Sequence, residues 1–410
     1  MPRSRRSFFA TAALLGVPLV ALFGLPLNAQ DEPPPLGEAS VLTLSTRKDV
    51  AVTLSGYIQV DGRWLSGATQ RLPDGVVLRR ARFVVDAALP TGWHLRLQPD
   101  FGQGRVLVQD AYAGLERGGM TLRAGRFRPN YGVERMQSSS TLLFPERSLI
   151  NSLVPSRSLG AQLRWSPGAW TVTTGGFRTP IGTDAAAIDT DGDVEATIGS
   201  GHDLLLRTAW AWRREARYAD VQVSWLEGRE RGSLESPAMA RILTVGQQPI
   251  AAFRNDGSAT GTVTADGTRR RASAGAVVGT GRAMLAIEGA MLTQRGALNG
   301  ASGGVTTLGY VLRTNRVWNG RQLPSQEIEP ASARGAIEFG LRAGALGIWG
   351  EGAATLLSTR SQRRAASAGV ALGWVPGTLT RMSVAYDVTA TDRLRRVREH
   401  ALMVRVQQGF

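Results

Sequence analysis

The chain has no cysteine, a single lysine (Lys48) and only three histidines among its 410 residues. The absence of cysteine excludes disulfides, thiolate metal sites and cysteine nucleophiles. His94, His202 and His400 are far apart in the sequence and do not have the spacing of metal ligands. No serine, histidine and acid combination typical of a hydrolase can be assembled from the sequence. We therefore expect no catalytic residue, no cofactor and no metal site.

Long hydrophobic runs are also missing, except near the N-terminus. There, three arginines precede an apolar run at residues 8–27, and Leu27-Asn28-Ala29 resembles a small-residue cleavage site. We expect residues 1–29 to be a secretory signal peptide. Residues 4–9 also resemble a twin-arginine signal, which would export an already folded protein. Beyond the signal no stretch of about 18 apolar residues remains, so we expect no spanning helix.

The remaining chain alternates apolar and polar residues in segments of about ten. Residues 30–51 read as an acidic, proline-rich periplasmic linker, and the alternation covers 52–410. One clear segment places Trp93, Leu95, Leu97 and Phe101 on one face and His94, Arg96, Gln98 and Asp100 on the other. The final segment does the same, with Leu402, Val404, Val406 and Phe410 opposite Met403, Arg405, Gln407 and Gly409. Strands with one apolar and one polar face are typical of a barrel in lipid.

Turns and loops also favour a barrel. Short Gly/Pro turns alternate with long polar connections at about 128–157, 179–200 and 229–268, as expected for periplasmic and extracellular rims. We count about seventeen candidate strands, but closed antiparallel barrels of this type have an even number. We therefore predict an all-β, transmembrane, antiparallel up-and-down β-barrel of 16 strands, with 18 as the alternative if residues 240–245 form another strand. A soluble β-sandwich fits less well, because its outward faces should be mostly charged.

Arginine dominates the face that alternation assigns to the lumen. The net charge is +15, nearly all of it from arginine, which binds phosphate and carboxylate oxygens through a planar fork of donors. Export makes nucleic acid an improbable partner, so we expect none. The predicted pore-lining residues are Arg80, Arg82, Arg96, Asp100, Arg123, Arg164, Arg207, Arg342 and Arg405. These arginines either form a ladder for anions or pair with inner-face acids, namely Asp86, Asp100, Asp110, Glu288 and Glu338.

Residues 56–165 resemble the phosphate-selective porin O/P family. The matching motifs are Gly56-Tyr57-Ile58-Gln59-Val60-Asp61, Leu78-Arg79-Arg80-Ala81-Arg82-Phe83, Pro99-Asp100-Phe101-Gly102, Leu122-Arg123-Ala124-Gly125-Arg126-Phe127-Arg128-Pro129-Asn130-Tyr131-Gly132 and Phe144-Pro145-Glu146-Arg147-Ser148. A second match lies in the C-terminal part, for example Leu372-Gly373-Trp374-Val375-Pro376, whereas about 179–280 matches poorly. The resemblance implies a trimeric outer-membrane porin, with the loop after the fifth strand folded inward as a constriction.

That loop corresponds to about 128–158. The resemblance implies an anion site there, and the candidate residues are Arg126, Arg128, Arg135, Ser138, Ser139, Ser140, Arg147 and Arg157. The loop holds only Glu134 and Glu146 as acids, so we expect its arginines to be unpaired. The family also uses lysines, which this chain lacks after Lys48, and arginine replaces their charge but not their compact shape.

Two weaker signals remain. Tyr57 and Tyr112 either line the entrance or belong to an interfacial aromatic girdle. Residues 189–195 resemble a calcium loop but lack its spacing, so a solvated acidic tip is the preferred interpretation.

We predict an outer-membrane porin for passive uptake of inorganic phosphate or other small anions, surrounded by lipid and assembled as a homotrimer. The alternatives are a general diffusion porin with mild anion preference, an outer-membrane barrel enzyme, and a non-conducting structural barrel.

Overall fold

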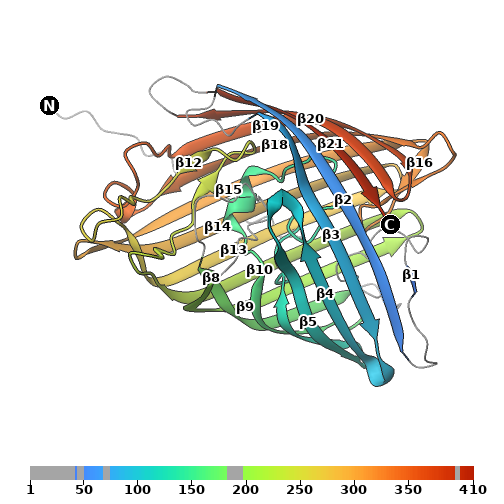
Figure 1. Ribbon diagram of the computed structural model, residues 1–410, viewed down its shortest axis with the longest axis horizontal. Coiled ribbons are helices and arrows are strands. Elements are labelled where there is room, and N and C mark those ends of the chain that lie inside the picture. The colour runs from blue at the N-terminus through green and yellow to red at the C-terminus, as the bar shows by residue number, and fades with distance from the viewer. Residues whose placement is uncertain (1–41, 44–49, 68–73, 182–196, 393–397) are drawn as a thin grey trace, which may run out of the picture.

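The computed structural model is a closed antiparallel β-barrel. It describes residues 42–43, 50–67, 74–181, 197–392 and 398–410. Sixteen long strands form the wall, and Figure 1 shows them inclined to the long axis of the barrel. Among the described residues no helix is long and apolar enough to cross a membrane.

The wall strands follow one another in chain order, each antiparallel to its neighbours. They are β2 (Ala51–Ser66), β3 (Gly75–Ala88), β4 (Trp93–Asp100), β5 (Leu107–Arg117), β6 (Met120–Phe127), β7 (Ser158–Trp165), β8 (Trp170–Ile181), β9 (Thr197–Arg214), β10 (Arg217–Arg231), β13 (Thr264–Thr280), β14 (Ala283–Leu298), β15 (Ala301–Trp318), β18 (Ala336–Trp349), β19 (Arg364–Gly377), β20 (Thr380–Thr391) and β21 (Arg398–Gly409).

The remaining elements lie in the connections. They are β1 (Leu42–Thr43), β11 (Ile242–Leu243), β12 (Pro249–Ala251), β16 (Gly320–Gln322), β17 (Ile328–Pro330), η2 (Pro90–Gly92), η3 (Gly102–Gly104), η4 (Leu149–Leu153) and η5 (Glu351–Ala353).

Pairing of β2 with β21 closes the barrel, from Tyr57 opposite Gly409 to Ser66 opposite His400. This confirms the prediction of sixteen strands. The eighteen-strand alternative is wrong, because the segment at 240–245 contributes only β11, which pairs with β12 in a small separate hairpin. The two-residue strand β1 pairs with the start of β2 and is not a member of the ring.

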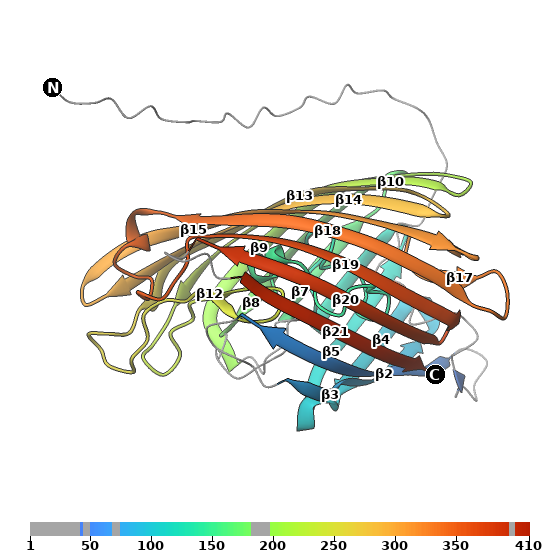
Figure 2. The same cartoon turned by 90° about the horizontal axis from the view of Figure 1, so that it is seen from above.

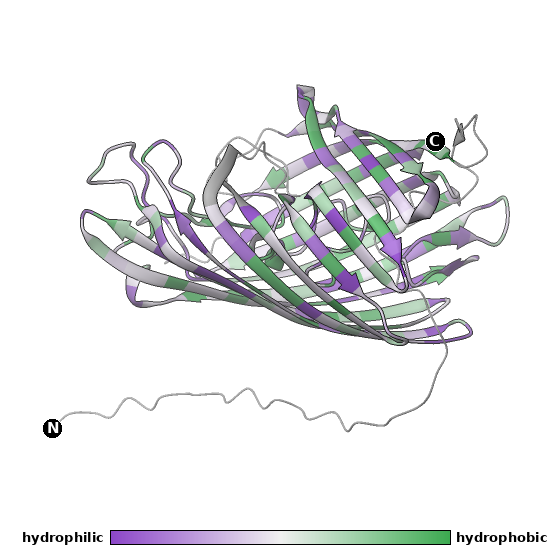
Figure 3. Ribbon diagram, turned by 90° about the horizontal axis from the view of Figure 1, so that it is seen from below, coloured by the Kyte–Doolittle hydropathy of each residue, from purple (hydrophilic) through white to green (hydrophobic). Residues whose placement is uncertain are grey.

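Alternation places apolar side chains outside and polar ones inside. On β4, Leu95 and Leu97 are 45% and 47% exposed, while Gln98 and Asp100 are buried. Figure 3 shows the same alternation of green and purple along the strands. A wall that is apolar outside and polar inside matches a barrel with lipid around it and water within it.

An aromatic girdle is formed by tryptophan. Nine of the ten tryptophans are exposed on the outer face, several of them beside short turns: Trp64, Trp93, Trp165, Trp170, Trp212, Trp225, Trp318, Trp349 and Trp374. The interpretation of Tyr57 and Tyr112 as girdle residues is wrong, because both side chains are buried on the inner face, at 4% and 8% exposure.

The long and short connections lie mostly at opposite ends. One exception is the connection between β15 and β18, which holds the β16–β17 hairpin at the short-turn end. The other is the two-residue turn between β14 and β15, which lies at the long-loop end. In Figure 2, β12 and β17 lie at opposite ends of the barrel. Long loops mark the extracellular rim of such barrels, so β17 lies on the periplasmic side.

An apolar core lies inside the barrel, next to its inner wall. Three connections supply it, 128–157, 232–263 and 350–363, through residues such as Leu153, Val245 and Leu356. Inward residues of the wall, including Val305 and Ile348, complete it. Burial of these side chains favours loops folded into the bore over loops extended into solvent.

Three expectations lie outside the described residues. These are the signal peptide at 1–29, most of the linker at 30–51, and the acidic stretch at 189–195.

Candidate functional site

The connection 128–157, called here the inner loop, leaves the fifth wall strand, β6, and enters the bore. Its tip contacts the wall at β2 and β3. The Ser139 hydroxyl is 2.6 Å from the Tyr57 hydroxyl and accepts a hydrogen bond from Arg82 at 3.0 Å. The Gln59 side-chain amide donates to the Ser139 carbonyl at 3.0 Å.

The inner loop also contacts the far wall. The Glu288 carboxylate of β14 accepts hydrogen bonds from the backbone N–H groups of Val133 and Glu134, at 2.9 and 2.8 Å. Arg313 of β15 donates to the Gln137 side-chain oxygen at 3.1 Å. β2 is the first wall strand and β14 the eleventh, so the inner loop bridges the bore.

The four loop arginines are buried, each at most 6% exposed. Arg128 and Arg147 donate to carbonyls of the loop itself, for example Arg147 to the Gln137 carbonyl at 2.8 Å. Arg135 donates to Asn151 at 3.4 Å. Arg157 forms an ion pair with Asp110 of β5 at 2.7 Å. The expectation of unpaired loop arginines is therefore wrong, because it counted only the acids of the loop. It neglected the wall acid that pairs with Arg157, and the carbonyl and amide oxygens that accept hydrogen bonds from the other three.

Glu134 is the central acid of the inner loop. It accepts hydrogen bonds from the Ser148 backbone N–H, at 3.2 Å, and from the Ser148 hydroxyl, and Arg313 lies 3.6 Å away. Burial raises the pKa of Glu134, but Arg313, the Ser148 hydroxyl and Arg147 outweigh burial and hold the pKa below its usual range. Glu134 therefore stays ionised and fixes the loop backbone.

The remaining candidates from the loop motif differ in position. The Ser138 and Ser140 hydroxyls are 2.9 Å apart. Arg126 does not belong to the loop. It is in β6 directly opposite Leu159, whose side chain is 41% exposed on the outer face. Directly opposed residues share one face of a sheet, so Arg126 points outward and its placement in the anion site is wrong.

Most predicted pore-lining residues are locked in buried networks. Arg82 pairs with Asp100 at 2.7 Å, and Arg405 makes two 2.7 Å contacts with Asp61. Arg80 donates to Gln59 at 2.7 Å. Such pairs stiffen the wall, since removing one member leaves a buried, uncompensated charge.

Arg342 links the wall to the inner loop. It contacts both carboxylate oxygens of Asp387 on β20, at 2.9 and 2.8 Å, and donates to the Glu146 carbonyl at 2.6 Å. Its guanidinium carbon lies 4.1 Å from the centre of the Phe144 ring. Arg342 therefore acts as an anchor for the inner loop.

A second set of arginines is mostly buried but retains some exposure, 11% for the side chain of Arg96 and 12% for that of Arg164. Arg96, Arg123, Arg164 and Arg207 lie on the inner faces of β4, β6, β7 and β9. Arg96 forms an ion pair with Asp86 at 3.6 Å, and Arg164 forms one with Glu116 at 3.8 Å and donates to the Thr121 hydroxyl at 3.0 Å. The Arg123 guanidinium carbon lies 5.1 Å from the centre of the Tyr112 ring. Thr173 of β8 lies directly between Arg164 and Arg207 in the register. Tyr112 of β5 lies opposite Arg96. We call the four arginines, which lie along one side of the bore with Tyr112 and Thr173 between them, the basic strip.

Sequence reasoning missed several inward arginines. Arg79 and Arg80 are consecutive yet both fully buried, because β3 has a bulge at this point. Arg80 is opposite Gln59 of β2 and Leu78 is opposite Val60, so the register passes over Arg79. Strict alternation predicts only one of the two, so no simple signal identifies Arg79. Arg313 and Arg381 are also buried and inward, and alternation could have identified both.

A second connection, 232–263, crosses the mouth of the barrel. It leaves β10 and returns to β13, the ninth and tenth wall strands, yet contacts β21, the sixteenth. Glu399 of β21 accepts hydrogen bonds from the Thr244 hydroxyl at 2.8 Å and the Gly246 backbone N–H at 3.0 Å. The connection therefore covers part of the extracellular entrance.

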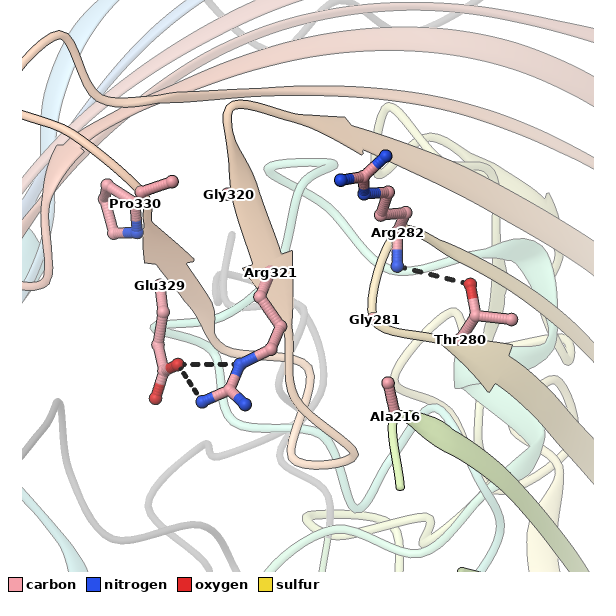
Figure 4. Close-up of a pocket in the computed structure, with 9 residues that line it drawn as sticks. Ala216, Thr280, Gly281, Arg282, Gly320, Arg321, Glu329 and Pro330 are labelled. Atoms are coloured by element: carbon pink, nitrogen blue, oxygen red, sulfur yellow. Dashed lines mark hydrogen bonds and ion pairs between the residues drawn. The ribbon is translucent and has the colours of Figure 1, made fainter. Parts of the chain in front are cut away.

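The periplasmic rim carries a pocket of about 600 Å³ between the β16–β17 hairpin and two neighbouring turns. Figure 4 shows Arg321 paired with Glu329 in the hairpin, with Arg282 and Thr280 on the adjacent turn. The Arg321–Glu329 distance is 2.5 Å and both side chains are exposed. This internal pairing reduces the charge that the pocket offers to an anion.

Comparisons with known proteins agree with this architecture. The outer membrane channel DcaP of Acinetobacter baumannii is 11% identical, with a TM-score of 0.57 over 90% of this chain and 99% of that chain. An anion-selective porin from Comamonas acidovorans is also 11% identical, with a TM-score of 0.54 over 88% and 100%. A trimer form of OmpT from Vibrio cholerae is 8% identical, with a TM-score of 0.51 over 88% and 100%. At these identities the likeness shows the fold alone.

No curated protein matches the sequence. The family described as phosphate-selective porin O and P matches residues 52–407, which is almost the whole barrel. The chain therefore belongs to the phosphate-selective porin O and P family and is a porin of the bacterial outer membrane.

Proposed function

We propose that this porin conducts small anions, phosphate and similar oxyanions among them, along Arg96, Arg123, Arg164 and Arg207. The observation that carries the proposal is that these four arginines retain some exposure, 11% and 12% for the side chains of Arg96 and Arg164, whereas Arg80, Arg82, Arg342 and Arg405 are at most 4% exposed. Only a guanidinium that retains contact with water can exchange that water for a passing anion. Asp86 and Glu116 face the same water and moderate the field without cancelling it.

The energetic scale fits passage rather than capture. Two unit charges about 4 Å apart attract by roughly 1 kcal/mol in bulk water and about 4 kcal/mol at an effective dielectric near 20. A divalent phosphate gains about twice as much as chloride from each arginine. Several weak sites in a row allow an ion to move on, whereas one deep site would block the pore.

The inner loop acts in this proposal as the constriction, and its arginines maintain its shape. The acceptors of these arginines belong to the protein: carbonyls for Arg128 and Arg147, Asn151 for Arg135 and Asp110 for Arg157. The loop contacts the wall at β2, β5, β7, β10 and β14. It thereby narrows the path that an anion takes past the basic strip.

The uneven height of the wall supports a homotrimer. The strands β4, β6 and β7 have 8 residues each, whereas β9 and β15 have 18. A strand needs about 9–11 residues to cross a bilayer, so the short side is poorly matched to lipid. We assign this side to contacts between subunits, in line with the trimer form named for the Vibrio protein. We assign residues 1–29 to an export signal.

Reversal potentials across a KCl gradient in planar bilayers test the proposal, followed by titration of phosphate into the chloride current. We expect anion preference, and a reduction of the chloride current by phosphate. The double variant R164Q/R207Q should lose most of the preference, and the control R214Q/R316Q, which removes two exposed arginines outside the basic strip, should keep it.

Cation preference in the unaltered protein would refute the arginine mechanism. Anion preference without any effect of phosphate would indicate a general diffusion porin, and the absence of channel events would indicate a structural barrel.

A further inference from the structure

A row of basic residues crosses the outer face of β8, β9 and β10 near the long-loop rim. Arg178 lies directly opposite His202, and His202 directly opposite Arg229. All three side chains are exposed. Directly opposed side chains in an antiparallel sheet have Cβ atoms about 5 Å apart, so the three form one continuous group.

The same row extends toward β6 and the next row toward β13. Arg178 is also opposite Leu159, which in turn is opposite Arg126. Arg270 lies on the outer face of β13, half exposed, and pairs with Glu227 at 3.1 Å. Arg126 is on the short side of the wall that we assign to subunit contacts, so we call only Arg178, His202, Arg229 and Arg270 the outer-rim strip.

The outer-rim strip borders the apolar band. Leu204 and Leu206 follow His202 on the same face of β9 and are 65% and 54% exposed. They are the hydrocarbon-facing residues at this height, so the strip lies where lipid headgroups begin. Because the long loops mark the extracellular rim, these headgroups belong to the outer leaflet.

We propose that the outer-rim strip binds the phosphate groups of the phosphorylated glycolipid, lipopolysaccharide, that forms the outer leaflet. Arginine suits this ligand because its planar fork of donors matches two phosphate oxygens at once. The spacing along the row allows Arg178 and Arg229 to hold one phosphate between them with His202, or two neighbouring phosphates. Glu227, the acid next to this row, forms its ion pair with Arg270. The row of Arg178, His202 and Arg229 therefore keeps a net positive charge.

A matched control exists at the other rim. Arg214 and Arg217 are directly opposite each other at the β9–β10 turn, both exposed, beyond the girdle residue Trp212. The variants R178Q/R229Q, on β8 and β10, and R214Q/R217Q, on β9 and β10, therefore remove the same charge from opposite rims of the same part of the wall.

The probe is bisphosphorylated lipid A added to the purified full-length barrel in neutral detergent, with the bound fraction measured by native mass spectrometry. Each basic residue near a charged lipid surface changes affinity by about fivefold. We expect R178Q/R229Q to bind lipid A about 25-fold more weakly than the unaltered protein, and R214Q/R217Q to bind it equally well. Dephosphorylated lipid A should bind weakly to all three proteins.

Equal affinity of R178Q/R229Q and the unaltered protein for lipid A would overturn the proposal, as would equal binding of the dephosphorylated lipid. Competition by inorganic phosphate at concentrations similar to those of lipid A would also overturn it, since it would indicate a site for free phosphate only. Heat-modifiable gel mobility checks that each variant is folded. The KCl reversal potential should be the same for all three, because the replaced side chains face outward, so this test is independent of the conduction proposal.

Discussion

Replacement of Arg342 by glutamine tests whether the buried arginines anchor the inner loop or conduct ions. Arg342 is 4% exposed. Its guanidinium contacts Asp387, the Glu146 carbonyl and the Phe144 ring at the same time. Arg342→Gln removes the positive charge and leaves the Asp387 carboxylate buried without its bidentate partner. The loop loses the hydrogen bond that holds Glu146 to β18.

The magnitude follows from these contacts. Breaking a buried ion pair by removing one partner costs about 3–5 kcal/mol. The contact with Phe144 contributes about 0.5–2 kcal/mol, but it involves the same guanidinium and does not add fully. We expect Arg342→Gln to lower the free energy of unfolding by about 4 kcal/mol. The double variant R342Q/D387N should be about 2 kcal/mol more stable than the single variant, because no charge remains unpaired.

Urea unfolding of the barrel in lipid vesicles, followed by tryptophan fluorescence, measures both values. Single-channel recordings of R342Q should show larger current fluctuations, since the inner loop is less firmly held. The anion preference should change less than in R164Q/R207Q. If R342Q unfolds at the same urea concentration as the unaltered protein, or R342Q/D387N is the less stable of the two variants, the anchoring role is wrong.

Three further predictions concern loop and wall packing. Gly369→Ala would place a Cβ 1.9 Å from an oxygen of Asp387, so we expect destabilisation in the same urea assay, and an unchanged midpoint would contradict this. The pKa of Glu134 is lowered in the folded state. Its carboxylate therefore stabilises the fold above about pH 4.3, and this stabilisation is lost as the pH falls further. Glu134→Gln should flatten the pH dependence of the free energy of unfolding below that pH, and an unaltered slope would refute the role of Glu134. Glu399→Ala removes the carboxylate that accepts two hydrogen bonds from the connection 232–263. Single-channel conductance should therefore rise or fluctuate more, and an unaltered trace would show that this contact does not limit entry.

The wall of the barrel was predictable because its physics is local. Alternation with a period of two depends on neighbouring residues only, so the faces of β4 and β21 could be assigned from their own sequences. The even number of strands followed from closure. The tyrosines were misassigned, because an aromatic ring on an inner face and one in the girdle give the same local pattern.

The bore was harder to predict because its contacts are distant in sequence. Arg157 and Asp110 are 47 residues apart, separated by β6 and most of the inner loop. Arg342 of β18 contacts Asp387 of β20 and Glu146 of the inner loop. Whether an arginine is locked or water-exposed depends on such partners and not on its own neighbours. The bulge at Arg79 and the outward direction of Arg126 show that one residue of register reverses a side chain.

The seam between β2 and β21 has a consequence for biogenesis. Gly56 and Phe410 exchange backbone hydrogen bonds at 3.1 Å, and the Phe410 ring packs against Phe83 at 5.4 Å between ring centres. The two edges of the sheet are therefore joined by residues synthesised first and last among the wall strands. Until both are present the chain exposes two unpaired edges, which are prone to aggregation. The ring can close only after β21 has been synthesised, so the unfolded chain needs protection from aggregation until the two edges pair.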